Sequence, residues 1–209
     1  MDRSPISKLP KEGRQKLLND LNYLNTAEIK SFCKRHSIPY AIAIETGDGR
    51  RMRTGDDDRK GVMLNRVRHY LQTGVVLEGT CFPSAVVCFD PLPKTLTPAD
   101  RLYYGQYDKQ DRALMDLLKD LTGGQFRNGA VARILAREFW SKGEAPTFKD
   151  FAAAWLRASR DHTKPNPEWA FLTDRANRRA IADWKKMRSD TATKVLGILR
   201  RIAGADPKR

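Results

Sequence analysis

Short amphipathic segments, interrupted once by a stretch rich in proline and β-favouring residues, are the feature that most constrains this chain. Apolar residues recur at helical spacing over most of residues 10–74 and again over residues 99–202. Between about Val75 and Pro98 the periodicity is lost, and four prolines accompany Val, Phe and Thr. This pattern predicts a mainly α-helical fold in two parts, joined by one or two short strands and an extended proline-rich connection.

Local start and stop signals place several of the helices. Asn25 followed by Glu28 has the spacing of a capping box, which predicts a helix start. Thr97-Pro98-Ala99-Asp100 combines a cap, a proline and an acid, and predicts a second start. Thr73-Gly74 and Gly123-Gly124 predict the ends of two helices, and Thr147–Asp150 predicts the beginning of another. We therefore expect a compact helical bundle in the second half.

Apolar faces at helical spacing supply a core for both halves, since 40% of the residues are hydrophobic. In the first half the expected buried residues are Leu17, Leu21, Leu24, Ile29, Phe32, Cys33, Leu64, Val67 and Leu71. In the second half they include Leu114, Leu118, Val131, Ile134, Leu135, Phe139, Phe151, Trp155, Val195 and Leu199. The chain is therefore expected to be folded and not disordered.

A second non-helical segment lies inside the first half, at residues 40–54. Ile42 and Ile44 alternate with small residues, and Gly47-Asp48-Gly49 is a turn signal. This pattern predicts a β-hairpin or an extended arm. Three arginines follow the turn, namely Arg50, Arg51 and Arg53. Guanidinium groups on such a segment suit phosphates or the minor groove, although the same charges would also keep an exposed edge strand soluble.

The charge balance points to a polyanionic partner. The chain has 39 Lys and Arg against 25 Asp and Glu, a net charge of +14 and an isoelectric point near 9.9. No apolar run approaches the roughly 18–20 residues needed to cross a bilayer, and the first residues lack the apolar stretch of a secretory signal. Three cysteines predict free thiols. We expect a cytoplasmic protein without membrane contact, associated with the nucleoid if its source is bacterial.

Residues 24–74 resemble the SAP family, a helix–extended loop–helix module that binds DNA. Thr26–Cys33 matches the order of a cap, Glu, an apolar residue and Lys at the start of the first helix of that family. Ile38-Pro39-Tyr40 matches its corner, and Lys60–Val67 matches its second helix. The resemblance covers about a quarter of the chain, and the connecting loop is longer here than is usual in the family. It implies a DNA-binding module built on two short helices.

One departure from the family changes where DNA contacts are expected. Asp56–Asp58 stand where phosphate-binding helices of the family show Gly and Lys, and carboxylates at a helix start repel phosphate. Contacts should therefore shift to the arm and to the basic sides of the helices. The candidate DNA-binding residues are Lys30, Lys34, Arg35, Arg50, Arg51, Arg53, Arg59, Lys60, Arg66 and Arg68.

A second group of cations lies near the end of the chain. Its members are Arg175, Arg178, Arg179, Lys185, Lys186 and Arg188, followed by Lys194, Arg200 and Arg201. This group is either a second nucleic-acid surface or the solvated side of an ordinary bundle.

The sequence contains few signals for metal binding or catalysis. Cys33 and His36 have a C-x2-H spacing, but Cys33 falls on an apolar face, and the other two cysteines are too far apart for a typical zinc pair. No metal and no cofactor are therefore expected. The nucleotide-binding, zinc-protease and serine-hydrolase motifs are absent from the sequence. Asp56–Asp58 with Lys60 keep a metal-dependent nuclease open as an alternative.

Together these features predict a non-catalytic protein that binds double-stranded DNA, in a regulatory role such as transcription regulation or in an architectural one. Residues 1–76 would form a SAP-like module with an Arg-rich arm, residues 77–98 a strand and proline-rich linker, and residues 99–209 a helical bundle open to a protein partner. The other alternative is an adaptor whose basic faces meet an acidic protein.

Overall fold

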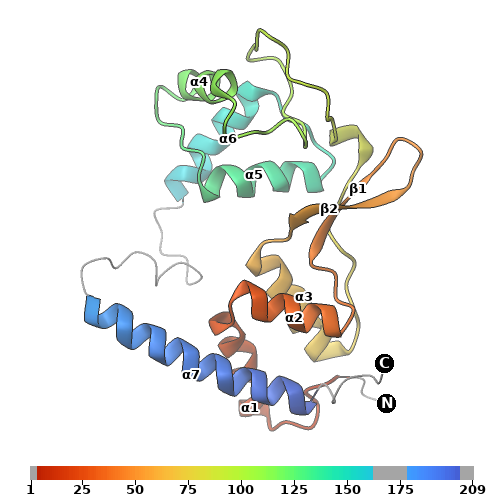
Figure 1. Ribbon diagram of the computed structural model, residues 1–209, viewed down its shortest axis with the longest axis vertical. Helices are drawn as coiled ribbons and strands as arrows, with labels where there is room; N and C mark the ends of the chain where they lie inside the picture. Colours follow the sequence, from red (N-terminus) through yellow and green to blue (C-terminus); the bar gives the residue numbers. More distant parts are fainter. Residues whose placement is uncertain (1–3, 162–177, 203–209) are drawn as a thin grey trace. The chain divides into compact units, whose positions relative to one another are not determined.

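The computed structural model describes residues 4–161 and 178–202, which fall into two compact units. The described part of unit 1 lies within residues 4–41, 55–80 and 178–202, and that of unit 2 within 42–54 and 81–161. The elements are labelled in Figure 1.

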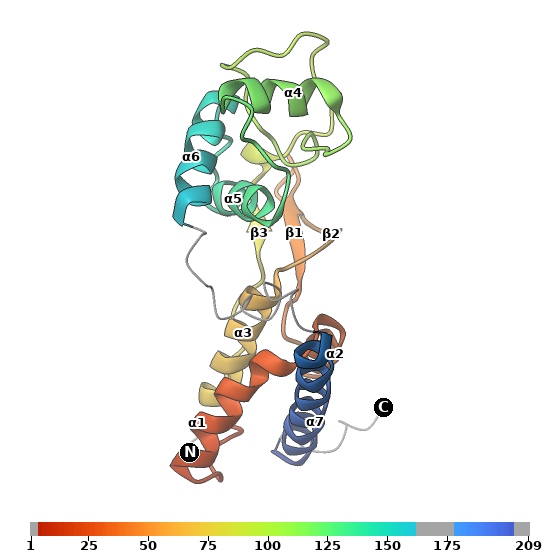
Figure 2. The same cartoon turned by 90° about the vertical axis from the view of Figure 1, so that its left-hand side faces the viewer.

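Unit 1 is helical. Its elements are α1 (Lys11–Asp20), the 3-10 turn η1 (Leu21–Tyr23), α2 (Thr26–Arg35), α3 (Lys60–Thr73) and α7 (Arg178–Ile202). α2 packs against α3, and α7 packs against α1 and η1 (Figure 2). The buried apolar residues form one cluster: Ile6, Leu17, Leu21, Leu24, Ile29, Phe32, Cys33, Ile38, Met63, Leu64, Val67, Leu71, Ala192, Val195 and Leu199. Segments far apart in the sequence therefore share one core.

The helix ends of unit 1 follow the predicted signals. Asn25 accepts a hydrogen bond from the Glu28 N–H, and the Glu28 carboxylate accepts one from the Asn25 N–H, which completes the capping box. Gly74 ends α3 in the left-handed conformation, with φ of 72°. The acids at 56–58 do not cap α3, because the helix begins at Lys60 and Arg59 is its N-cap.

Unit 2 combines a small sheet with three helices. Its elements are β1 (Ala41–Glu45) and β2 (Arg51–Asp57), of which residues 41 and 55–57 belong to unit 1, and β3 (Cys81–Phe82), the 3-10 turn η2 (Ser84–Val86), α4 (Arg112–Leu121), α5 (Ala130–Ser141) and α6 (Phe148–Asp161). The strand order is β2-β1-β3, and β1 pairs with β3 in parallel, with Ala43 opposite Cys81. α6 packs against both α4 and α5 (Figure 1). The apolar side chains of β1 enter the core of this unit.

The core of unit 2 is rich in aromatic rings. Phe82, Phe126, Phe148 and Phe151 are buried together with Trp140 and Trp155, which makes core packing the role of these two tryptophans. The buried face of α5 consists of Ala132, Ala136 and Trp140. The predicted residues Val131, Ile134, Leu135 and Phe139 are only partly buried. The small alanines, not the larger side chains, mark the inner face because they permit close packing of α5.

The predicted fold class, mainly α with an inserted hairpin, is confirmed. The predicted helix start at Thr97–Asp100 is wrong. The Asp100 carboxylate does bond to the Thr97 N–H and hydroxyl, but these bonds close a turn. The carbonyls of Pro98 and Asp100 then accept hydrogen bonds from the N–H groups of Lys149 and Phe148, at 3.1 and 2.9 Å, at the start of α6. These residues form a turn and no helix, because their carbonyls pair with this distant backbone segment.

The two units differ from the predicted division at 76 and 99. The hairpin at 42–54 belongs to unit 2, and α7 belongs to unit 1 and not to the bundle formed by α4, α5 and α6. Trp169 and Phe171, expected in a helix, lie outside the described residues. Among the described helices, none is both long and apolar enough to cross a membrane.

Candidate nucleic-acid interface

Arg188 of α7, predicted as part of the second basic group, holds unit 1 together. Its Nη2 donates to the Glu28 carboxylate at 2.7 Å, and its Nε donates to the Tyr23 carbonyl at 2.9 Å. Glu28 thereby serves both the capping box of α2 and the attachment of α7. Only about a quarter of each side chain is exposed. Arg188 therefore has a structural role within unit 1, and only part of its side chain is accessible to a partner.

Arg66 of α3, predicted as a DNA contact, is buried. Its side chain is 8% exposed, and its Nη1 pairs with Asp58, whose side chain is 5% exposed. Nη1 also donates to the Pro39 carbonyl at 3.0 Å, and Nη2 donates to the Thr80 hydroxyl at 2.9 Å. The Thr80 hydroxyl in turn donates to Asp58 at 2.7 Å. DNA cannot reach this guanidinium, because it is buried against three internal acceptors: Asp58, the Pro39 carbonyl and the Thr80 hydroxyl. This prediction is therefore corrected.

Three further predicted cations have internal partners but remain partly accessible. Arg68 donates to the Asn22 side chain at 2.8 Å, and Lys60 donates to the Asn22 carbonyl at 2.6 Å. Lys30 forms an ion pair with Asp57. Two of the carboxylates near the start of α3, Asp57 and Asp58, are thus engaged by cations of the same unit. The charge that these lysines and arginines offer to a partner is reduced.

The remaining predicted cations of α2 and its surroundings lie at the surface. Lys34 and Arg35 are exposed near the end of α2, and Arg59 is half-buried before α3. Arg175 lies outside the described residues, and Arg178 and Arg179 fall in the part of α7 whose side chains are not described.

The turn of the hairpin is tightly bonded. The Thr46 N–H donates to the Arg50 carbonyl at 2.8 Å, and the Thr46 hydroxyl donates to the Asp48 carboxylate. The hydrogen bonds from the Thr46 hydroxyl and the Arg50 N–H hold the pKa of Asp48 below its usual value. A carboxylate therefore stays ionised beside the arginines of the hairpin.

The three arginines of the hairpin are exposed, as expected for an arm. The Arg50 side chain is 86% exposed and pairs with Asp48 at 3.1 Å. The Arg51 side chain is 61% exposed, and its Nε lies 3.9 Å from Glu45. Arg53 is also exposed. The net charge of residues 42–54 is only +1, because two acids accompany the three arginines. The hairpin thus presents guanidinium groups without a strong positive electrostatic field.

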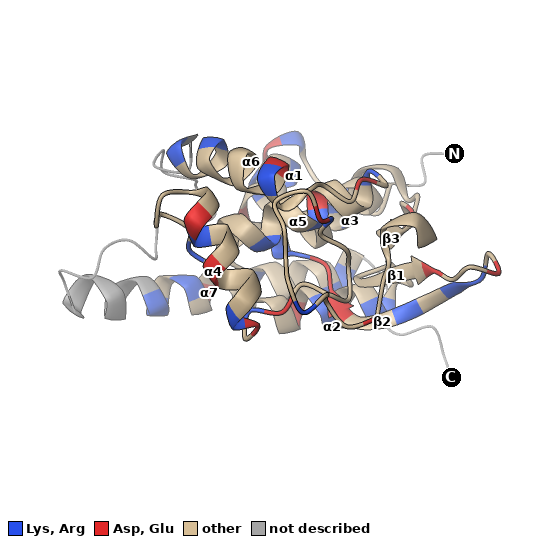
Figure 3. Cartoon of the chain, turned by 90° about the horizontal axis from the view of Figure 1, so that it is seen from above, with Lys and Arg blue, Asp and Glu red and all other residues tan. Residues whose placement is uncertain are grey.

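The outer face of α7 is rich in exposed cations. From Lys185 to Ile202 the helix has six Lys and Arg and one acid, Asp190. Its inner face is apolar and buried, through Ala192, Val195 and Leu199. Figure 3 marks the Lys and Arg positions along this helix in blue. The exposed cations of α7 are Lys185, Lys186, Lys194, Arg200 and Arg201. They form the α7 cationic face, which the sequence had left open between an interface and a solvated surface.

Cys33 and His36, the pair with C-x2-H spacing, lie in apolar and aromatic surroundings. Burial raises the pKa of the Cys33 thiol to about 11, despite the nearby Arg66 cation. His36, three residues later, packs its ring against Phe32 and Tyr70. Within residues 4–161 and 178–202, no group of three or more His, Cys, Asp or Glu is arranged to hold a metal ion.

A hollow that was not predicted lies at the start of α5. Its volume is about 470 Å³, and its wall includes Gln125, Arg127, Gly129, Ala130, Val131, Trp155 and Ser159. The signal in the sequence is Gly129, which stands before an apolar helical segment where Ser, Thr or Asp is usual. Asn128 does not supply the cap, since its side chain accepts a hydrogen bond from the Tyr107 hydroxyl at 3.0 Å.

Comparison with known proteins identifies no relative: no family model, no curated protein and no solved structure matches this chain.

Proposed function

We propose that this protein binds the phosphate backbone of double-stranded DNA without catalysis, mainly through the α7 cationic face of unit 1. Unit 1 has 23 Lys and Arg against 13 Asp and Glu, a net charge of +10, whereas unit 2 has 16 against 12, or +4. The observation that carries the proposal is the concentration of exposed cations on residues 185–202 of α7, a range in which Asp190 is the only acid.

The spacing on α7 suits repeated phosphate contacts. Lys186, Lys194 and Arg201 are separated by eight and seven residues, which corresponds to about 12 Å and about 10 Å along the helix axis. These separations correspond to about 2.2 and about 1.9 turns, so the three side chains lie within about 80° of one another around the helix. Each phosphate neutralised releases counterions from the DNA, and binding should depend strongly on salt.

The hairpin arginines are proposed as a second contact. Arg50 and Arg51 have long, exposed side chains, and a narrow hairpin can enter a groove where larger elements cannot. The two helices expected from the SAP resemblance, α2 and α3, are present and pack together, which supports that hypothesis without testing it. Backbone contacts carry little sequence information, so we propose a regulatory or architectural role in the cytoplasm with weak sequence selectivity.

The test compares two variants of equal charge. Lys186, Lys194 and Arg201 are changed to Gln, and in the control Lys142, Lys149 and Arg157 on unit 2, which are also exposed, are changed to Gln. Fluorescence anisotropy with a labelled duplex is measured over a range of salt concentrations. The slope of log affinity against log salt should fall by about 3 in the α7 variant and remain close to wild type in the control.

Other outcomes would contradict the proposal. Equal losses in the two variants would show that net charge, and not the α7 cationic face, governs binding. Weak affinity for DNA in the wild type would favour an adaptor that meets an acidic protein. Cleavage of plasmid DNA by the protein with Mg²⁺ or Mn²⁺ would contradict the proposal that it binds DNA without catalysis. If reversing the charge of Arg50, Arg51 and Arg53 left the affinity for DNA unchanged, the hairpin would be excluded as a DNA contact.

A further inference from the structure

Gly197 lies in the interior of α7, at a position where packing within the described chain does not require a glycine. α7 has 25 residues, and inside a helix glycine is less favourable than alanine. The φ of Gly197 is not in the left-handed region, and a Cβ at this position would meet no atom within 4 Å. Neither the backbone conformation nor a close neighbour therefore explains the glycine.

The direction in which Gly197 faces follows from the helix geometry. Successive residues of an α-helix are rotated by about 100° around its axis. Gly197 thus lies about 160° around the helix from both Val195 and Leu199, whose side chains are 1% and 2% exposed. Gly197 itself is partly exposed. It therefore faces away from the core of unit 1, on the same side as the α7 cationic face.

The residues that surround Gly197 on the helix surface are three cations and a hydroxyl. Surface neighbours on a helix are three and four residues apart, which is about 4.5–6 Å along the axis. For Gly197 these neighbours are Thr193, Lys194, Arg200 and Arg201, all of them exposed. Asp190 is not among them, because it lies seven residues before Gly197. We call Gly197 with these four neighbours the Gly197 gap.

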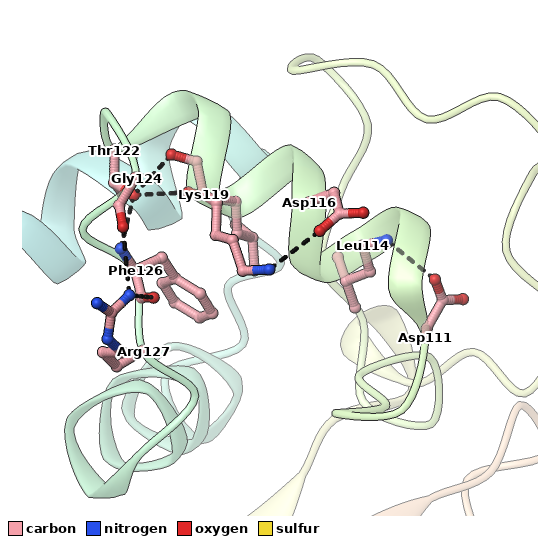
Figure 4. Close-up of polar contacts among 9 residues, drawn as sticks. Asp111, Leu114, Asp116, Lys119, Thr122, Gly124, Phe126 and Arg127 are labelled. Carbon is pink, nitrogen blue, oxygen red and sulfur yellow. Dashed lines mark hydrogen bonds and ion pairs between the residues drawn. The ribbon is translucent and has the colours of Figure 1, made fainter.

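The three cations of the Gly197 gap are available to a partner. Within residues 4–161 and 178–202, none of the three side chains forms an ion pair or a hydrogen bond. Cations elsewhere in the chain do have internal partners. Lys119 of α4 pairs with Asp116 at 3.1 Å, and Arg127 donates to two backbone carbonyls at 3.2 and 3.0 Å (Figure 4). Because the charge of the Gly197 gap is not compensated locally, its complement is an anion.

The extent of the surrounding charge favours DNA as that anion. The α7 cationic face continues over about 24 Å, from Lys185 to Arg201. A row of phosphates matches this length, whereas a single small anion would use only one part of it. A second copy of α7 is disfavoured, since it would bring two sets of exposed lysines and arginines together.

We propose that a phosphate of the DNA backbone contacts the bare helix surface at Gly197, where Lys194, Arg200 and Arg201 converge on it. This inference rests on the proposed function and specifies where the DNA approaches α7 most closely. A side chain at position 197 would hold the phosphate away from the helix, and the two guanidinium groups could then no longer reach it together. Glycine thus sets the depth at which the DNA backbone lies on α7.

The test fills the Gly197 gap without changing the charge of the protein. Gly197→Ala and Gly197→Leu are compared with the wild type by fluorescence anisotropy, with a labelled duplex over a range of salt concentrations. Affinity should fall about twofold in Gly197→Ala and about tenfold in Gly197→Leu. In Gly197→Leu the slope of log affinity against log salt should also fall by about 1, as for the loss of one phosphate contact.

Gly13 of α1 provides the matched control. It is also a helical glycine of unit 1, and a Cβ there would meet only the Pro10 Cδ at 3.7 Å, an ordinary van der Waals contact. Gly13→Leu should bind the duplex within about twofold of the wild type. By circular dichroism, Gly197→Ala and Gly197→Leu should melt no lower than the wild type, because both new residues favour a helix more than glycine does. Equal losses of affinity in Gly13→Leu and Gly197→Leu would overturn the inference.

The outcomes separate this inference from the proposed function. Weak affinity of the wild type for DNA would overturn both. If affinity is lost when Lys186, Lys194 and Arg201 are changed to Gln but is unchanged in Gly197→Leu, the proposed function stands and this inference alone is wrong. A dimer in analytical ultracentrifugation that Gly197→Leu dissociates would make the Gly197 gap a contact between copies and would exclude DNA as its occupant.

Discussion

Replacing Asp58 by Asn should destabilise unit 1 by about 3–5 kcal/mol, because it leaves a buried guanidinium without its counter-charge. The Arg66 and Asp58 side chains are 8% and 5% exposed, so water cannot take the place of the lost carboxylate. The substitution preserves volume and creates no cavity. It also weakens the network through Thr80, whose hydroxyl donates to one Asp58 oxygen while Arg66 pairs with the other.

The measurement is a double-substitution cycle in urea, followed by circular dichroism. Asp58→Asn, Arg66→Met and the combination are compared, and the combined loss should fall short of the sum by about 2 kcal/mol. Hydrogen exchange of the α3 amides assigns the loss to unit 1. As a control, Asp20→Asn breaks the ion pair with Lys16, whose side chain is 77% exposed, and should change stability by less than about 0.5 kcal/mol. Similar losses in Asp58→Asn and Asp20→Asn would refute the reasoning.

Two other predictions concern backbone strain and pH. Gly105 has φ of +99°, and a Cβ there would lie 2.3 Å from the Cys88 carbonyl oxygen, so Gly105→Ala should lower the free energy of unfolding by more than about 2 kcal/mol. Gly123→Ala, at φ of +59° with open space, should lose about 1 kcal/mol, and equal losses in urea would contradict the steric argument. Burial, aided by the Arg35 cation, lowers the pKa of His36 below 6.5, so the neutral ring is favoured in the fold. Its contribution to stability is present above pH 6.5 and is lost as pH falls through the lower folded pKa; the free energy of unfolding should therefore decrease from about pH 7.5 to about pH 5.5. His36→Phe should flatten this dependence, and a variant with the same slope as the wild type would contradict it.

Local signals in the sequence were sufficient wherever a few neighbouring residues decide the structure. The capping box of Asn25 and Glu28, the end of α3 at Gly74 and the turn of the hairpin all depend on side chains within a few positions. Local signals gave the wrong structure where hydrogen bonds to distant backbone groups determine it. Asp100 and Thr97 make the bonds of a helix cap, yet these residues form a turn whose carbonyls pair with the start of α6.

The residues of the candidate interface show the same contrast between local signals and distant contacts. Exposure of the hairpin arginines follows from their place after a turn and was foreseen. The burial of Arg66 was not, because it requires Asp58 and Thr80, which approach only when α3 and the following segment pack together. Similarly, Arg188 stands among exposed lysines in the sequence, and only the fold brings it to Glu28. Charge composition alone does not separate cations that hold a protein together from those that face outward.

The participation of α7 in unit 1 has a consequence for biosynthesis. The ribosome makes α1, α2 and α3 first, then all of residues 81–161 of unit 2, and only afterwards the helix that supplies Ala192, Val195 and Leu199. Until α7 emerges, Leu17, Leu21 and their neighbours lack part of their apolar cover, so the amino-terminal helices cannot complete their core. By that time all the described strands and helices of unit 2 have been made, and this unit can fold first. The element proposed to hold DNA is thus also the one that completes this fold, and a nascent chain would acquire both properties in a single late event.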